Sequence, residues 1–131
     1  METRIEEARA KKVSGKYNCA QSVACTYCDL AGMSQEQISA VTAGFGVGMG
    51  NMQGTCGALV GAGVIIGLKT ADRIQAMKAM KRVMDKFEAR NSSTICCALK
   101  GIGTGHKLRD CNDCVADAAE FLESELNEAK L

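Results

Sequence analysis

Cysteine is the residue type in this chain best suited to chemistry, because the 131 residues include 8 cysteines but a single histidine. Four cysteines come one to three residues after a residue type that caps helices. The first turn of a helix has unpaired backbone N–H groups and the positive end of the dipole, which favour a thiolate over a thiol. Thiolates are nucleophiles and metal ligands, whereas a buried thiol also serves as a small apolar side chain. The four candidates with their capping residues are Cys19 after Asn18, Cys56 after Thr55, Cys96 after Ser93 or Thr94, and Cys111 after Asp110.

Two Cys-x-x-Cys pairs are also present, Cys25 with Cys28 and Cys111 with Cys114. Cys111 is expected at a helix start, where it would be an attacking thiolate with Cys114 as the resolving thiol. Cys25 and Cys28 are expected within or late in a helix, where a disulfide between positions i and i+3 is strained. A zinc site formed by both pairs remains possible on spacing alone.

The other motifs exclude several kinds of site. His106 lies in a glycine-rich loop, where a solvated histidine is the simpler interpretation, although it could be a ligand or base. No Cys-x-x-Cys pair is followed by histidine, so covalent attachment of c-type haem is excluded. The glycine runs match neither dinucleotide-binding nor phosphate-binding patterns.

The elements that must position the cysteines are predicted to be helices. The chain has no proline and few aromatic residues, and its apolar residues recur at helical rather than strand spacing. Caps are expected at Asn18, Ser34, Thr55, Thr70 and Asp110, and a basic fifth helix could pair with an acidic last one. We predict an all-α fold over 1–131, a compact bundle of about five to six helices in a single domain. The predicted segments are 2–14, 19–30, 35–43, 56–68, 71–90, a short helix ending at 100, and a last helix from 111.

A glycine-rich loop at 44–54 precedes the predicted helix at 56–68. The stretch 37–68 contains no Asp, Glu, Lys or Arg, so this helix is expected to be central and buried. Glycine is costly within a helix, so its four glycines indicate close packing against the backbone. The neighbour could be another helix, a cofactor or a second subunit, and we expect a homodimer on this ground.

Composition limits the partners. The formal net charge of +1 gives no electrostatic case for nucleic acid or an anionic membrane. The longest strongly apolar run, 58–68, is too short to span a bilayer. The charged N-terminal segment is not typical of a secretory signal, so we expect a cytoplasmic protein whose cysteines are metal ligands or redox thiols rather than a disulfide framework.

Several of these segments together resemble a bacterial family of redox-active proteins named after its cysteine pattern, C_GCAxxG_C_C. The resemblance covers about 16–122, although the chain reads Gly54-Thr55-Cys56-Gly57-Ala58 where the pattern has an uninterrupted GCA. The segments that carry it are NCAQSV at 18–23, AGFG at 43–46, GMG at 48–50, TCGALVG at 55–61, GL at 67–68, STIC at 93–96, and Cys111 with Val115, Ala118 and Ala119.

The resemblance implies redox activity without an assigned reaction, and a family found largely in anaerobic bacteria and archaea. A related domain looks to be shared with split-Soret haem proteins, but the haem attachment is absent here. The family cysteines map onto Cys19, Cys56, Cys96 and Cys111, the same four that the capping residues select.

Three hypotheses follow from the cysteines. The first is a small redox protein that holds an iron–sulfur cluster, or zinc as a structural variant, on Cys19, Cys56, Cys96 and Cys111. It would exchange electrons with a redox partner protein or sense redox state. The second is a thiol–disulfide oxidoreductase that uses Cys111 and Cys114, or pairs among the first four. The third is a structural helical dimer with inert thiols.

Overall fold

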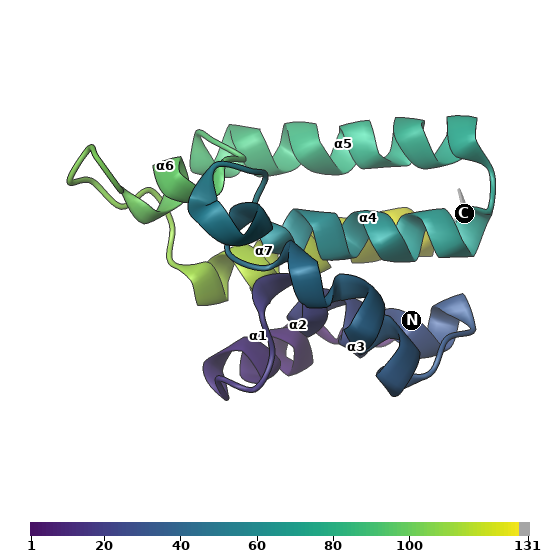
Figure 1. Cartoon of the computed structure of the whole chain (residues 1–131). Coiled ribbons are helices and arrows are strands. Elements are labelled where there is room, and N and C mark those ends of the chain that lie inside the picture. Colours follow the sequence, from purple (N-terminus) through teal and green to yellow (C-terminus); the bar gives the residue numbers. More distant parts are fainter. Residues whose placement is uncertain (129–131) are drawn as a thin grey trace.

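The fold is all-α, as predicted. The computed structural model describes residues 1–128, so the last three residues of the predicted domain, 129–131, lie outside it. Within the described residues there are seven α-helices, more than the five to six expected, and no strand (Figure 1). They are α1 (Ile5–Val13), α2 (Cys19–Tyr27), α3 (Gln35–Thr42), α4 (Gly57–Thr70), α5 (Arg73–Asn91), α6 (Cys96–Lys100) and α7 (Cys111–Asn127).

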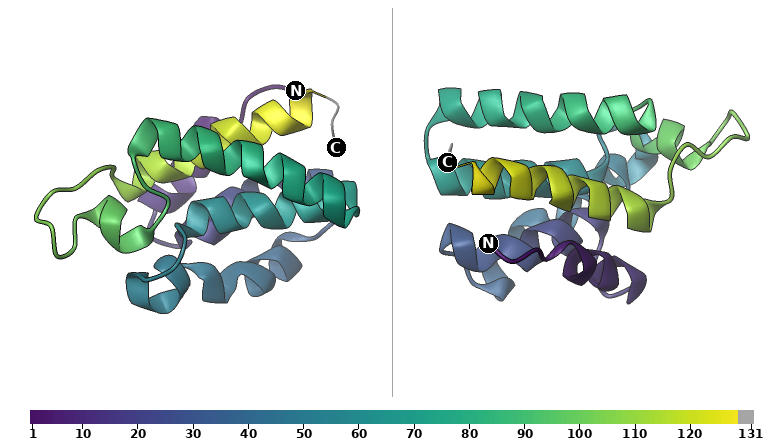
Figure 2. Two further views of the ribbon diagram at one scale, coloured as in Figure 1. Left: turned by 90° about the horizontal axis from the view of Figure 1, so that it is seen from above. Right: turned by 180° about the vertical axis from the view of Figure 1, so that it is seen from behind.

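The helices lie in three layers, with α4 and α7 between α5 on one side and α1, α2 and α3 on the other (Figure 2). The core fills the space between these layers with fully buried side chains such as Tyr27, Leu59, Ile65, Phe87 and Leu122. Helix α4 contacts α2, α5 and α7, so the predicted central position of this helix is confirmed.

Several predicted caps are confirmed. Asn18 and Ser34 each form a capping box, with Gln21 and Gln37 respectively, and Asp110 accepts a hydrogen bond from the backbone N–H of Asn112. These caps fix the starts of α2, α3 and α7. Two of them place Cys19 and Cys111 at the first position of a helix.

Other predicted boundaries were wrong. Thr55 does not cap α4, because Thr55 forms a β-bridge with Ile95 and Cys56 itself is the N-cap. Helix α4 runs on through Thr70, which therefore does not cap α5. Ala71 ends α4 in a left-handed conformation, and Asp72 caps α5 by accepting hydrogen bonds from two backbone N–H groups.

The start of α6 and the loop at 44–54 also differ from expectation. Ile95 is the N-cap of α6 and makes no side-chain capping bond, so neither Ser93 nor Thr94 caps this helix. The loop contains two short helical turns, η2 (Ala43–Phe45) and η3 (Gly48–Met52).

Two of the four glycines in α4 explain the tight packing of this helix. A Cβ atom on Gly61 would lie 2.4 Å from the carbonyl oxygen of Ala20, and one on Gly57 would lie 2.7 Å from that of Phe45. The backbone of α2 is therefore the close neighbour at Gly61. Gly63 and Gly67 point elsewhere and have no backbone against them.

Ion pairs connect the basic α5 to the acidic α7, as expected. Arg82 binds the buried carboxylate of Glu125 at 2.7 Å, and Arg90 binds both Asp117 and Glu120. None of the helices formed by residues 1–128 combines the length and apolarity that a membrane span requires.

Candidate functional site: a pocket lined by five cysteines

Five of the eight cysteines line one pocket of about 50 Å³. They come from the N-terminal ends of four helices: Cys19 from α2, Cys56 from α4, Cys96 from α6, and Cys111 and Cys114 from α7. The structure thus brings together the four candidates selected by their capping residues. Cys114 joins them because it lies one turn after Cys111 on the same helix face.

A short β-bridge holds Cys56 and Cys96 side by side. The backbone N–H of Cys56 donates to the carbonyl of Thr94 at 2.7 Å, and that of Cys96 donates to the carbonyl of Gly54 at 3.0 Å. The bridge fixes the starts of α4 and α6 relative to each other, although these helices are distant in the sequence. This explains why no side-chain cap is needed at α6.

The glycine-rich loop closes over Cys96. Gly48 has φ +54°, and a Cβ atom there would lie 2.4 Å from that of Cys96, so only glycine fits. Val47, Met49 and Met52 are also left-handed, a conformation that is costly for residues with a side chain. Val47 lines the pocket and is 46% exposed, which places it at the pocket mouth.

Cys19 and Cys111 form the first thiol pair. A hydrogen bond from Cys19 lowers the pKa of Cys111 to about 6, with further help from the positive charges of Lys100 and Lys12. The same hydrogen bond, followed by burial, raises the pKa of Cys19. At neutral pH this pair is therefore one thiolate and one thiol.

Cys56 and Cys114 form the second pair, and their pKa values shift in opposite directions. The hydrogen bond from Cys114 lowers the pKa of Cys56, and the N–H groups of Ala58 and Leu59 in the first turn of α4 lower it further. The pKa of Cys114 is raised by this bond and by burial. Burial also raises the pKa of Cys96, which Lys100 partly opposes.

The acidity of Cys111 gives a direct prediction. Because its folded pKa is lowered to about 6, the reactive thiolate is present above that pH and is lost as the pH falls through it. In metal-free, reduced protein, the rate of Cys111 alkylation by iodoacetamide, followed by peptide mass spectrometry, is expected to reach half its maximum near this value. The same peptide in urea should titrate near pH 8.5. A folded midpoint above pH 8 would contradict the paired arrangement.

Three cationic side chains complete the pocket: Lys12, Lys100 and Arg109. Lys12 and Lys100 have no carboxylate partner in an ion pair within residues 1–128. These positive charges favour negative charge on the sulfurs. The sequence did not identify them, since isolated lysines and arginines are usually solvated.

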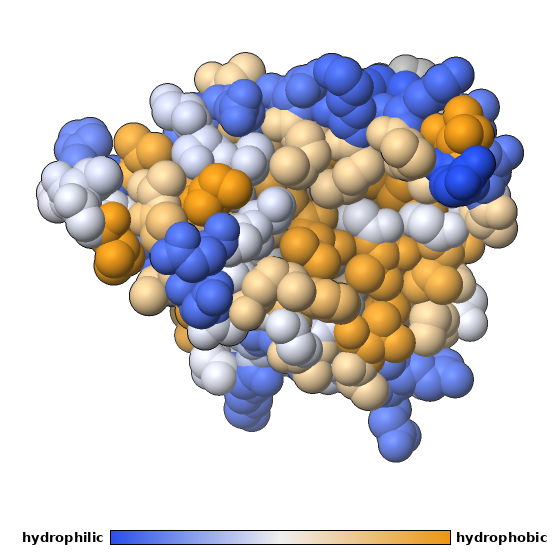
Figure 3. Space-filling model, turned by 45° about the horizontal axis from the view of Figure 1, so that its top comes forward, coloured by the Kyte–Doolittle hydropathy of each residue, from blue (hydrophilic) through white to orange (hydrophobic). Residues whose placement is uncertain are grey.

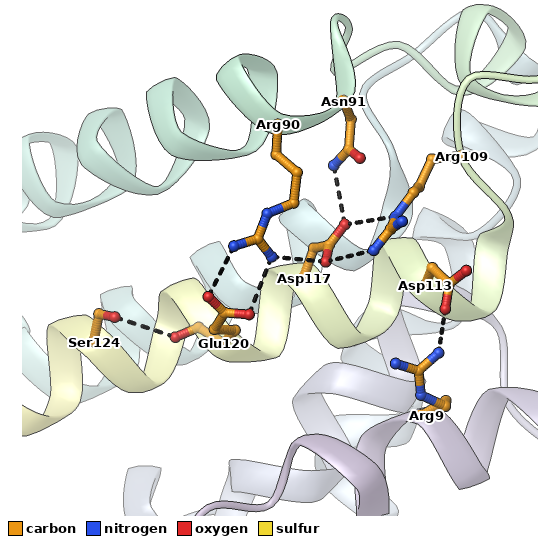
Figure 4. A network of polar contacts seen from close by, with 8 residues as sticks. All are labelled: Arg9, Arg90, Asn91, Arg109, Asp113, Asp117, Glu120 and Ser124. Atoms are coloured by element: carbon orange, nitrogen blue, oxygen red, sulfur yellow. Dashed lines mark hydrogen bonds and ion pairs between the residues drawn. The ribbon is translucent and has the colours of Figure 1, made fainter.

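Arg109 is held in the pocket wall by Asp117 (Figure 4). Its Nε and Nη2 donate to the two carboxylate oxygens of Asp117 at 3.0 and 3.1 Å. Asp117 is only 4% exposed and also accepts from Arg90 and Asn91, so its charge is well compensated. The pocket is thereby fixed to the α5–α7 contact.

The remaining candidates lie outside this pocket. Cys25 and Cys28 are buried, burial raises the pKa of both thiols, and the Gln35 amide donates to the Cys28 sulfur at 3.2 Å. The structure therefore does not assemble the zinc site that combined this pair with Cys111 and Cys114. His106 is exposed on its loop, and Cys97 is half-buried on α6; neither lines the pocket.

The cysteine sulfurs are arranged in pairs rather than around a point where one metal ion could bind. Across residues 1–128, no three Cys, His, Asp or Glu side chains are grouped as the ligands of one metal ion. Cys19 is hydrogen-bonded to Cys111 and Cys56 to Cys114, and Cys96 lines the same pocket. Thiolates arranged in this way are suited to redox chemistry.

Comparison with known proteins agrees with this geometry. A family described as "Putative redox-active protein (C_GCAxxG_C_C)" matches residues 17–125. The chain belongs to this family. The match confirms the resemblance found in the sequence. No curated protein and no solved structure gives a significant match.

Proposed function

We propose that this C_GCAxxG_C_C protein carries electrons through an iron–sulfur centre bound by Cys19, Cys56, Cys96 and Cys111. The observation that carries the proposal is the convergence of these cysteines, with Cys114, from four helix N-termini into one pocket. Four cysteine thiolates are the usual ligand set of such clusters. The number of free thiols fits the reducing cytoplasm, where we propose that the protein works with a redox partner protein.

The residues present fit a cluster better than a lone zinc ion. Zinc needs four donors around one point, and the described residues offer no such group. A two-iron cluster takes two thiolates on each iron, and the pocket supplies thiols in pairs. Cys19 and Cys111 are one pair, and Cys56 lies close to both Cys96 and Cys114.

The chain also supplies the electrostatics that such a centre requires. A cluster with four thiolates is negatively charged, and hydrogen bonds and cations around it stabilise the reduced form. Lys12, Lys100 and Arg109 line the pocket, and the first turns of α2, α4 and α7 direct backbone N–H groups toward it. When bound, the cluster supplies one-electron transfer. The protein residues hold it, balance its charge and limit its contact with water.

A second candidate function rests on the contact between Cys19 and Cys111. The Cys111 thiolate would attack a disulfide in a partner, forming a mixed disulfide and releasing one partner thiolate. Cys19 would then pass its proton to the released partner thiolate and attack the Cys111 sulfur. The second partner sulfur would leave as a thiolate and take a proton from water, so that the partner becomes a dithiol and Cys19–Cys111 a disulfide. The sequence offered either Cys114 as the resolving thiol or pairs among Cys19, Cys56, Cys96 and Cys111, and the hydrogen bond between Cys19 and Cys111 supports the second option.

Elemental analysis of protein purified without oxygen tests the proposal. We expect at least about two irons per chain with matching acid-labile sulfide, and a brown colour that bleaches with dithionite. A colourless, metal-free protein in which Cys19 and Cys111 change between thiol and disulfide would favour the second function. One zinc per chain would retain the site but remove electron transfer.

A further inference from the structure

The outward face of α4 is an apolar surface with no partner in the described chain. Figure 3 shows a broad hydrophobic region over α4, bordered by the hydrophilic side chains of α5. On α4 this surface consists of Val60, Val64 and Leu68, which follow one another at helical spacing. Leu68 is 40% exposed, while the two valines are half-buried. The stretch 37–68 has no Asp, Glu, Lys or Arg side chain to solvate this face.

Methionines of α5 extend the same surface. The Met80 sulfur lies beside Gly63 of α4, which shows that this side of α5 faces the α4 surface. Met77 and Met84 are three residues before and four residues after Met80, on the same side of α5. Met77 is 64% exposed. The α4 patch, as we define it, consists of Val60, Gly63, Val64, Gly67, Leu68, Met77, Met80 and Met84.

The α4 patch contains both a groove and the ridges that would fill it. A Cβ atom on Gly67 would meet nothing within 4 Å, and one on Gly63 would meet only the flexible end of Met80. Gly67 therefore leaves a shallow depression on the outside of α4, and Gly63 lies against the Met80 side chain. Val60, Val64 and Leu68 project beside this depression as a row of apolar side chains.

We propose that a second copy of this chain covers the α4 patch, so that two α4 helices pack across a two-fold axis. A two-fold contact requires one surface to be complementary to itself, and a groove beside a ridge on one helix meets this condition. Because the patch carries no charge, two copies can face each other without like-charge repulsion. At its border, Lys81 and Asp85 supply both signs of charge. Within each copy, the contact between α2 and α4 stays intact because Gly57 and Gly61 face the inside of the molecule.

The oligomeric state of reduced protein tests this proposal. Sedimentation equilibrium in a phosphine reductant, which removes intermolecular disulfides, is expected to give twice the 13.8 kDa mass of one chain. The double variant Leu68→Glu, Met77→Glu should be monomeric at about 100 µM, because two added charges in each copy would face each other. Circular dichroism should show unchanged helix content, since both side chains are exposed.

A matched control separates this interface from charge effects in general. Val13 is 63% exposed on α1, in the layer that lies away from α5, so Val13→Glu should leave the dimer intact. A wild-type chain that stays monomeric up to about 100 µM overturns the proposal, as does a dimer that the double variant leaves unchanged. Metal content plays no part in this readout, so the result is independent of the proposed iron–sulfur function.

Discussion

Replacing Cys56 by Ser is expected to reduce the iron content of anaerobically purified protein by at least tenfold. Cys56 is the N-cap of α4, it is buried in the pocket, and the hydrogen bond from Cys114 lowers its pKa, which favours the thiolate that binds metal. A serine hydroxyl is a much poorer ligand for iron, because it is not ionised at neutral pH. Iron and sulfide should be measured per chain, together with the visible absorption spectrum.

Cys97→Ser is the matched control for this measurement. Cys97 follows Cys96 directly on α6 but does not line the pocket. Its replacement should leave iron and sulfide at the wild-type level. Iron that survives Cys56→Ser, or is lost equally in both variants, would remove Cys56 from the ligand set. Far-ultraviolet circular dichroism of both proteins excludes loss of fold as the cause.

Replacing Asp117 by Asn is expected to destabilise the reduced protein by about 2–3 kcal/mol, because it removes a buried carboxylate that accepts charge-assisted hydrogen bonds from two guanidinium groups. Asp117 is 4% exposed and binds the guanidinium groups of Arg90 and Arg109 as well as the Asn91 amide. Asparagine keeps the size of the side chain but removes the charge and presents an N–H₂ group toward donors. Urea unfolding at constant reductant concentration measures the free energy of unfolding.

Asp85→Asn provides the comparison. Asp85 forms an exposed ion pair with Lys81 on α5, at 2.6 Å, and exposed pairs contribute about 0–1 kcal/mol. A loss of similar size in both variants would show that the network around Asp117 adds no more than a surface pair. A larger loss at Asp117 supports the view that it fixes Arg109 in the pocket wall.

Local sequence signals were sufficient to predict a helix boundary where the interaction that fixes this boundary is itself local. The capping boxes of Asn18 and Ser34 and the cap at Asp110 depend on residues within one turn, and all three were predicted. The start of α4 was missed by one residue because Gly54 and Cys56, on either side of Thr55, are hydrogen-bonded through their backbones to a segment about forty residues later. The position of Asp72 was overlooked because Thr70, a possible cap, precedes it.

Within the site, the sequence indicated which cysteines to consider but not how they pair. The contact between Cys56 and Cys114 depends on how α4 crosses α7, and helix spacing within one segment contains no such information. The same holds for Lys12 and Lys100, which come from α1 and α6 and meet only in the folded chain. The left-handed backbone at Val47 was also unexpected, because a β-branched residue rarely adopts it.

Both thiol pairs join α7 to another helix, and this links the redox state of the pocket to the resistance of the fold to unfolding. A disulfide between Cys19 and Cys111 would close a loop that spans most of the chain, and one between Cys56 and Cys114 would close a loop nested largely within it. Each such crosslink reduces the entropy of the unfolded chain, which stabilises the folded state by about 4 kcal/mol. Oxidation in air would then raise the free energy of unfolding while converting the cysteines that we propose as metal ligands into disulfides. A reductant would reverse both effects. Thermal stability measured without control of the thiols would therefore report oxidation as much as sequence.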